Sequence, residues 1–321
     1  MIYPEYFIHP NDAKAMEALK AIPAFTLLSK KYSDLITERS RKIVNMSSFI
    51  RISERQLPEI YEMLPPICEK LEMSVPELYL MQDPIINANA FGEVSTSIVL
   101  TSGLLEKCPT EIIKAVIAHE CGHIVCHHTT YHSLVHLFLT VGSSVLNIPL
   151  LTTALLIALL YWRRCSEYSA DRVAGFVYGA EPVVRTQMIF ASGSQTLFEK
   201  LDRDEFLKQA EDFHIYSEKT GWNKFMMYDT LLGQDHPFLV DRAAEILKWC
   251  DSKDYDDLCN GVPYTPPKPA AVIRCPKCGA PIDNETSFCS CCGTKIVHCP
   301  NCSAVFTEED TFCDKCGSKL S

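Results

Sequence analysis

The chain has 321 residues, of which 47% are hydrophobic and 22% charged, a composition typical of folded proteins and a poor fit to a disordered chain or a coiled coil. At about 150 residues per domain, this length predicts two domains, or one large domain and a small one. The 40 acidic residues outnumber the 30 basic ones and give a formal net charge of −10. Because proteins that coat nucleic acid need clustered basic surface, this balance argues against such a function.

The positions of cysteines and prolines predict how the chain is divided. Eight of the sixteen cysteines form four CxxC pairs after residue 274. Just before them, residues 263–273 contain four prolines, which cannot continue a helix or a central strand. We therefore expect a domain over residues 1–262, a linker over residues 263–273 and a small domain over residues 274–321.

The start of the sequence bears on the location of the protein. No basic segment leads into an apolar run there, so we expect no secretory signal. Sixteen cysteines without such a signal indicate a reducing compartment, in which they bind metal or remain thiols. We expect a cytoplasmic protein, with membrane association left open by an apolar segment described below.

The first domain is predicted to be α+β, mainly helical with a small sheet. Residues 1–45 have an amphipathic helical pattern, and residues 56–71 have a second one that two adjacent prolines should divide. Residues 78–81 and 97–101 are short β-type runs bounded by Pro, Asn and Gly.

Longer helices are predicted to follow these strands. Thr110 is the predicted N-cap of a helix that runs past His128. We expect further helices over residues 164–178, 206–216 and 239–250.

The most specific motif of this domain lies in the helix that begins at Thr110, where residues 119–123 read HECGH, an HExxH pattern. Residues four apart share a helix face, so the imidazoles of His119 and His123 can bind one zinc ion. Glu120 lies about 100° further round and can reach a water bound to the metal. By itself the pattern also fits an ordinary polar stretch of helix.

A second acidic segment could complete a metal site. Residues 166–171 read SEYSAD and place Glu167 and Asp171 four residues apart on a predicted helix. Glu167 could be a third ligand, which leaves a fourth position open to water as a hydrolytic zinc requires. Asp171 could accept a hydrogen bond from the ring nitrogen that faces away from the metal. On spacing alone, a solvated acidic helix face is the simpler explanation.

Five segments, in this order, resemble signatures of the HtpX-type and CaaX-prenyl-protease family of gluzincin metallopeptidases. They are residues 89–91 (NAF), 98–105 (IVLTSGLL), 119–123 (HECGH), 166–171 (SEYSAD) and 236–237 (HP). The resemblance covers roughly residues 50–248 and implies a zincin-type metalloprotease domain. Cys121 stands where the family more often has an aliphatic residue.

The resemblance implies roles for the residues of the two central motifs. His119, His123 and Glu167 would be the ligands of a catalytic zinc, and Asp171 would be the hydrogen-bond partner of a ligand. Glu120 would act as general base and then as general acid. The implied reaction is hydrolysis of a peptide bond by a water that zinc and Glu120 activate.

Other matched segments would position the substrate. Asn89, Ala90 and Phe91, with the strand at residues 98–101 as the edge, would hold an extended polypeptide by β-addition. Either His236 or Arg242 would steady the oxyanion, although residues 236–237 could equally be a turn that enters a helix.

Further histidines follow the HExxH pattern. His127 lies four residues beyond His123, and His128, His132 and His136 also step by four. A second metal is conceivable, but no carboxylate or cysteine is suitably spaced beside them. A partly exposed polar stripe is the preferred interpretation.

An uncharged segment over residues 137–162 lies between the two motifs, and Arg163 and Arg164 end it. Its length would suit one membrane span, but a single crossing would separate Glu167 from the histidines. Residues 147–149 (NIP) divide it into halves too short for two crossings. A hairpin packed in the fold, a hairpin that dips into one leaflet and an oligomer contact remain, and Trp162 with the arginines would suit a membrane interface. We expect a soluble or peripheral protein.

The cysteine tail resembles a double zinc ribbon with two four-cysteine zinc sites. Each site combines two CxxC pairs separated by ten residues, and each pair supplies two thiolates from one tight turn. Cys291 breaks this register and is left over. The expected ligands are Cys275, Cys278, Cys289 and Cys292 in the first site, and Cys299, Cys302, Cys313 and Cys316 in the second.

The charge of the tail bears on its partners. It carries five basic and six acidic residues over residues 274–321, so no basic stripe exists and phosphate affinity should be weak. We expect it to recruit protein partners or substrate, or to be a structural cap.

Together these features predict a zinc metalloendopeptidase that acts on extended or unfolded polypeptides and binds one catalytic and two structural zinc ions. Two alternatives remain open. One is a non-catalytic zinc-binding adaptor, although a purely structural zinc site would not need Glu120. The other is a membrane-associated protease that acts on membrane proteins, for which residues 137–162 would supply the contact.

Overall fold

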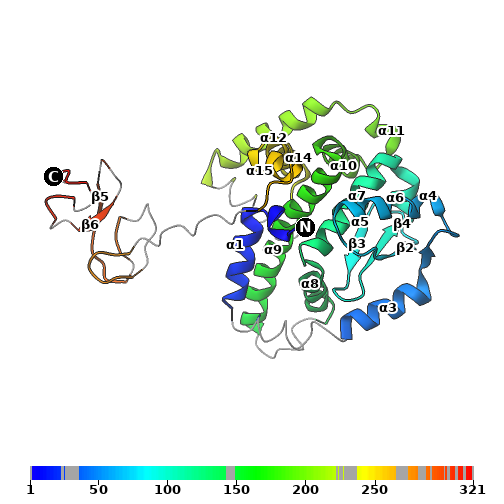
Figure 1. Cartoon of the computed structure of the whole chain (residues 1–321), viewed down its shortest axis with the longest axis horizontal. Coiled ribbons are helices and arrows are strands. Elements are labelled where there is room, and N and C mark those ends of the chain that lie inside the picture. Colours follow the sequence, from blue (N-terminus) through cyan, green and yellow to red (C-terminus); the bar gives the residue numbers. More distant parts are fainter. Residues whose placement is uncertain are drawn as a thin grey trace. The chain divides into compact units, whose positions relative to one another are not determined.

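A computed structural model of the chain describes residues 2–22, 25, 36–141, 149–221, 223, 227, 237–264, 274–280, 287–289, 291–299, 301, 304–307, 310–313 and 316–319. The chain divides into two compact units, Met1–Tyr264 and Thr265–Ser321. Each unit is described by itself below (Figure 1). The first is mainly helical with a small sheet, and the second is rich in cysteine, as the sequence predicts.

The sheet of the first unit has four strands in the order β1-β2-β4-β3. β2 and β4 are parallel, whereas β1 pairs with β2 and β3 pairs with β4 in the antiparallel sense. The bounds are Ile50–Ile52 for β1, Glu77–Met81 for β2, Ala88–Phe91 for β3 and Ser97–Thr101 for β4. The two strands predicted at residues 78–81 and 97–101 are confirmed.

The strand order corrects one expectation. The strand at residues 98–101 is not an edge, because β4 lies between β2 and β3 and is buried along its whole length. Among the described residues β3 pairs only with β4. The edge strand on this side of the sheet is therefore β3, which carries Asn89, Ala90 and Phe91.

Helices make up most of the first unit, and a short 3-10 helix, η1 (Pro4–Tyr6), precedes them. Their bounds are α1 Pro10–Lys20, α3 Ile36–Ser48, α4 Pro58–Tyr61, α5 Leu64–Lys70, α6 Ser102–Lys107, α7 Thr110–Val125, α8 Thr129–Val141, α9 Pro149–Tyr178, α10 Ala180–Ser192, α11 Gln195–Phe198, α12 Arg203–Glu218, α14 Leu239–Cys250 and α15 Lys253–Cys259. The helices expected near residues 164–178, 206–216 and 239–250 are confirmed as α9, α12 and α14, although α9 begins earlier. The helix expected over residues 56–71 is divided before its proline pair, because the prolines occupy the first turn of α5, where a missing N–H costs nothing.

The helix predicted to run past His128 ends at Val125 instead. His127 adopts a left-handed backbone with φ of 56°, and its N–H donates to the carbonyl of Ile124. The N–H of His128 donates to the carbonyl of His123 at 2.9 Å, which completes a Schellman motif. Thr110 is also not the cap, since Pro109 holds that position without a side-chain hydrogen bond.

The apolar segment over residues 137–162 lies in α8 and in the first half of α9, on either side of residues 142–148, which are outside the described part of the chain. α8 packs against α9, and α1 lies along α9 (Figure 1). This packing agrees with a hairpin packed in the fold. Across the described residues, we find no helix that combines the length and apolar character needed to cross a membrane.

Trp162 occupies the core between these helices and not a membrane interface. Its side chain is fully buried, with 0% exposed, among residues such as Leu134 and Leu159. Its indole Nε1 donates to Asp12 Oδ1 at 2.8 Å. Trp162 therefore gives no support to the membrane-interface alternative, because a buried carboxylate from α1 satisfies its polar end.

Close contact between α7 and α9 brings the two motifs together. Gly122 faces Ala170 and Val173, and a Cβ at Gly122 would lie 2.9 Å from the Cα of Ala170. That distance is too short for any real Cβ contact, and the neighbouring atom belongs to the backbone. Only glycine therefore allows α7 to approach α9 this closely.

Gly122→Ala should lower the free energy of unfolding of the first unit by about 1–3 kcal/mol, because the added methyl group overpacks the α7–α9 contact. The measurement is denaturant unfolding followed by tryptophan fluorescence, since all three tryptophans precede residue 265. Gly221→Ala is the control, because a Cβ there meets nothing within 4 Å. Equal stability of the two variants would contradict the packing argument.

The second unit has a two-stranded antiparallel sheet of β5 (Ile296–His298) and β6 (Val305–Thr307). Its two small cores are built around cysteines, with Ile296 in one and Phe306 in the other. Gly279, Gly293 and Gly317 each follow the second cysteine of a CxxC pair and have φ near 72°. These left-handed turns favour glycine and close each pair.

Candidate metal centre

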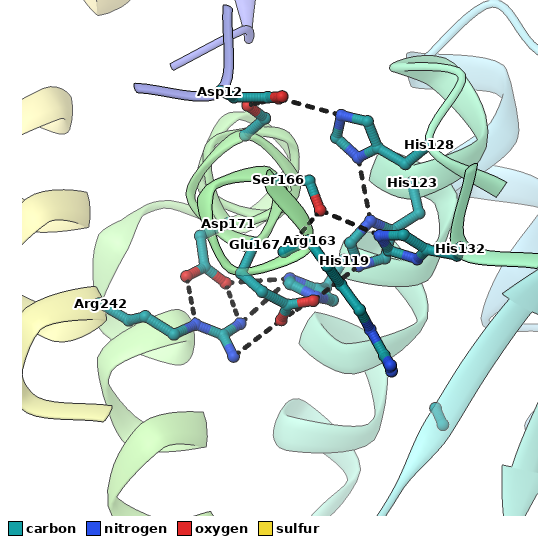
Figure 2. A network of polar contacts seen from close by, with 12 residues as sticks. Asp12, His119, His123, His128, His132, Arg163, Ser166, Glu167, Asp171 and Arg242 are labelled. Carbon is teal, nitrogen blue, oxygen red and sulfur yellow. Dashed lines mark hydrogen bonds and ion pairs between the residues drawn. The ribbon is translucent and has the colours of Figure 1, made fainter. Parts of the chain in front are cut away.

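The HExxH helix α7 and the SEYSAD segment of α9 face one another and place three potential ligands together. His119 Nε2 lies 3.4 Å from Glu167 Oε2, and His123 Nε2 lies 3.4 Å from Glu167 Oε1. Figure 2 shows both imidazoles turned toward the Glu167 carboxylate. His123 and Glu167 are buried, and His119 is nearly so.

These separations suit a zinc ion. Two ligand atoms about 2.1 Å from a tetrahedral ion lie roughly 3.4 Å apart, which is the distance found from Glu167 to each imidazole. One ligand atom of Glu120 also lies within 4.8 Å of those of His119 and His123. The donor set of two imidazoles and one carboxylate is that of a hydrolytic zinc with an open fourth position.

Asp171 lies one helical turn beyond Glu167 and contacts the opposite ring nitrogen of His119. The distance from His119 Nδ1 to Asp171 Oδ1 is 2.9 Å. This hydrogen bond leaves Nε2 of His119 to face Glu167 and fixes the orientation of the ring. The geometry is the one that the sequence predicts for a partner of a zinc-binding histidine.

Arg242 of α14 reaches into the same cluster. Its Nε and Nη2 donate to the two oxygens of Asp171 at 2.8 and 2.7 Å, and its Nη1 lies 3.0 Å from Glu167 Oε2. The guanidinium is buried, and through these contacts it links the two carboxylates (Figure 2). A role for Arg242 at the oxyanion stays a prediction, because these contacts engage its donors with Asp171 and Glu167.

The pKa values of the cluster follow from burial and from these pairs. Burial alone would raise the pKa of Asp171, but Arg242 and His119 outweigh it and lower that pKa. Burial would lower the pKa of His119, yet its hydrogen bonds with Asp171 and Glu167 raise it to about 9. Burial lowers the pKa of His123 to about 3, so this ring is neutral at pH 7, whereas His119 would have to release a proton when a metal binds.

A cleft of about 760 Å³ opens beside this cluster. Its walls include the β3 residues Asn89, Ala90 and Phe91, as well as His119, Glu120 and Glu167. Arg41 of α3 also lines it and lies 4.2 Å above the Phe91 ring. The segment expected to bind substrate therefore borders the same cleft as the candidate metal ligands.

The predicted oxyanion residue His236 belongs to a segment that the structure does not describe. His236 lies outside the described residues, whereas Pro237 and Leu239 next to it line the cleft. Its expected part at the oxyanion stays a prediction.

The histidines beyond the HExxH pattern do not form a stripe on one helix. His127 is exposed in the turn after α7, whereas His128 is buried with 2% exposed. His132 contacts Ser166 Oγ at 3.0 Å, and the side chain of His136 is outside the described part. The partly exposed stripe was a wrong expectation, because the helix break at residues 126–128 turns His128 into the core.

Two residues to which the sequence analysis gave no role at the site, Asp12 and His128, adjoin the cluster. His128 contacts both His123 and Asp12. A signal for His128 was its position five residues after His123, just past the end of the helix. No local pattern connects Asp12, which lies on α1 more than 100 residues upstream, to the site.

The cysteines of the second unit gather in two clusters. Cys275, Cys278, Cys289 and Cys292 form the first, in which the Sγ atoms of Cys275 and Cys292 are 3.7 Å apart. Four thiolates about 2.3 Å from a tetrahedral zinc lie roughly 3.8 Å apart, so the cluster fits the ion.

The second cluster contains Cys299, Cys313 and Cys316, with Sγ atoms of Cys299 and Cys316 3.6 Å apart. Cys302, its expected fourth ligand, lies outside the described residues. Cys291 is exposed and belongs to neither cluster, in agreement with its being left over.

Two parts of the chain match known protein families. Residues 54–250 match the model of peptidase family M48. The chain belongs to peptidase family M48. Residues 275–317 match the double zinc ribbon, so the second unit is a double zinc ribbon.

The chain also matches two relatives over most of each relative's length. The plastoglobule-localized metallopeptidase 48, chloroplastic, of Arabidopsis thaliana is 30% identical over 258 residues, which cover 78% of this chain and 74% of the relative. A protease HtpX homolog of Moorella thermoacetica is 24% identical over 222 residues, or 60% of this chain and 72% of the relative. The resemblance drawn from the five sequence segments is thereby confirmed.

Membership of the M48 family supports a zinc metalloprotease, for which the substrate is a polypeptide. Zinc is supported as the cofactor by the family and by the cysteine clusters of the ribbon. The expected cytoplasmic location gains no support from either relative and stays a prediction.

Proposed function

We propose that this M48 protein is a zinc-dependent metalloendopeptidase that hydrolyses peptide bonds in extended or unfolded polypeptides. The observation that carries the proposal is the convergence of His119, His123 and Glu167 at 3.4 Å spacing beside a cleft. The same cleft contains Glu120, a carboxylate that a purely structural metal site would not need.

The proposed ligands and their supports have separate tasks. His119, His123 and Glu167 would hold the metal, which when bound supplies a Lewis acid for the scissile carbonyl and lowers the pKa of a water toward about 7. Asp171 orients the His119 ring, and Arg242 holds Asp171 and Glu167 in place. Glu120 would accept the proton of the attacking water and deliver it to the leaving amine.

The proposed preference for extended chains follows from β3. As the edge strand it can accept one more strand through its outer backbone groups, and its residues border the cleft. Peptide groups of a folded helix or sheet are already hydrogen-bonded to one another, so only an extended or unfolded segment can pair there. This pairing would set the scissile bond near Glu120.

The Glu120→Gln variant should bind zinc like the parent but lose at least about 100-fold in the rate of hydrolysis of an unfolded protein, because the amide cannot accept a proton. The measurement combines a cleavage assay of the zinc-loaded chain with zinc analysis of the same samples. Glu111→Gln on the exposed start of α7 is the matched control and should cleave like the parent.

Two outcomes would contradict the proposal. Equal cleavage by the parent and Glu120→Gln would mean a different mechanism or a contaminating protease. Zinc-loaded parent that cleaves nothing would favour the alternative of a non-catalytic zinc-binding adaptor.

We also propose that the double zinc ribbon recruits the protein substrate. Two aromatic side chains at equivalent places, Phe288 and Phe312, are each 58% exposed. Each precedes a cysteine of the metal clusters and forms an isolated bridge with a lysine, Lys295 or Lys319. Exposed aromatic residues are enriched where proteins contact one another, and the balanced charge of the ribbon disfavours nucleic acid.

Replacement of both aromatic residues, Phe288→Ser with Phe312→Ser, should raise the KM for an unfolded protein several-fold and leave kcat unchanged, since only recruitment is affected. Cleavage of a short peptide that spans only the cleft should not change. Lys277→Ser, an exposed position in the same unit, is the control. An unchanged KM for the unfolded protein would contradict the recruiting role.

A further inference from the structure

A chain of hydrogen bonds extends from the candidate metal ligand His123 to the N-terminal helix. His123 Nδ1 lies 3.0 Å from Nδ1 of His128, and His128 Nε2 lies 3.1 Å from Asp12 Oδ2. Figure 2 shows His128 between Asp12 and His123, away from Arg242. Asp12 and His128 are each 2% exposed, so water does not compete for these contacts.

The direction of every proton in this chain follows from metal binding. If Nε2 of His123 binds the metal, the ring must carry its proton on Nδ1 and donate it. His128 Nδ1 must then be an acceptor, which leaves its proton on Nε2 to be donated to Asp12. The opposite direction would put a proton on Nε2 of His123 and prevent binding.

The hydrogen bonds of Asp12 keep it an acceptor, which sets the direction in which His128 and His123 donate their protons. Its Oδ2 also accepts from Ser169 Oγ at 2.6 Å, and its Oδ1 accepts from Trp162 Nε1 at 2.8 Å. Ser169 in turn accepts from the N–H of His9, just before α1. Burial would raise the pKa of Asp12, but these partners, His128 first among them, lower it. The carboxylate is therefore an acceptor at each of its contacts.

We propose that Asp12 and His128 are positioning residues that fix His123 in its metal-binding tautomer, so that helix α1 completes the metal centre. The inference deepens the proposed function and rests on it, since it takes His123 as a ligand. Asp12 lies outside residues 54–250, the segment that matches the M48 family. The Nδ1 atom of His123 is thereby connected to a buried carboxylate through His128, whereas Nδ1 of His119 contacts the carboxylate of Asp171 directly.

Substitutions of His128 separate positioning from space filling. Glutamine offers an acceptor oxygen to His123 and a donor nitrogen to Asp12, as the neutral histidine does. Leucine fills a similar volume and offers neither. If His128 only filled space in the core, leucine would serve at least as well as glutamine.

The experiment counts zinc ions per chain after dialysis of the full-length protein against graded concentrations of a chelator. His119→Ala identifies the zinc ion that belongs to this centre, because the ribbon sites keep theirs. His128→Leu should release that zinc at a chelator concentration about 10–100-fold lower than the parent does. His128→Gln should stay within a few-fold of the parent. His127→Asn, at the exposed neighbouring histidine, should not differ from the parent, because asparagine tolerates the left-handed backbone there.

Asp12→Asn is a second variant that tests the other end of the chain. Asp12 uses both oxygens as acceptors, whereas an amide has a single acceptor oxygen, so its NH₂ group must face either Trp162 or the pair of His128 and Ser169. It should also release zinc early, while Glu17→Gln on the exposed face of α1 should not. Thermal unfolding of each variant checks that the fold persists.

Three results decide the inference. Early release by His128→Leu and Asp12→Asn, with retention by His128→Gln, supports it. Loss of zinc from His119→Ala with parental retention by His128→Leu overturns this inference and leaves the metal centre standing. Parental zinc content in His119→Ala overturns the metal centre, and this inference with it.

Discussion

The close approach of α7 and α9 is the constraint on which the rest of the structure depends. Two imidazoles on one helix and a carboxylate on another can share an ion only if the helices touch along the motif. Gly122 makes that contact possible, since a side chain there would meet the backbone of Ala170. The chain between the helices must therefore leave and return on the same side. Its two described parts do so, since α8 packs on α9 and the first half of α9 packs on α1.

The contact between α7 and α9 also brings several buried carboxylates together, and neighbouring residues stabilise their negative charge. Asp12, Glu120, Glu167 and Asp171 are all buried. Isolated carboxylates in such surroundings would be protonated, because burial disfavours their charged form. Arg242 neutralises one side of the cluster, and on the other side hydrogen bonds from His128, Trp162 and Ser169 serve Asp12. A zinc dication between the histidines and Glu167 would add the charge that this arrangement favours.

Features set by local spacing could be predicted from the sequence. The four-residue period put His119 and His123 on one face, and the same period placed Asp171 one turn from Glu167. The repeated CxxC pairs similarly predicted the ribbon clusters. The short motifs that carry these residues were enough to show the resemblance to the metallopeptidase family and to the double zinc ribbon. The comparison with known families confirms both.

Features set by long-range contacts could not be predicted. The order of β3 and β4 depends on pairing across the sheet, so the edge was assigned to the wrong strand. The end of α7 depends on a left-handed backbone at His127, a position where glycine is the usual signal. The membrane interface stayed open as a place for Trp162 because its buried partner, Asp12, lies 150 residues upstream.

The most direct test of the central claim is an anomalous difference map from crystals of the zinc-loaded full-length chain, with data collected on both sides of the zinc absorption edge. The account predicts a zinc peak between α7 and α9, about 2 Å from His119 Nε2, His123 Nε2 and a carboxylate oxygen of Glu167. Zinc peaks in both ribbons with none between α7 and α9, or a peak there that Glu167 does not contact, would contradict it.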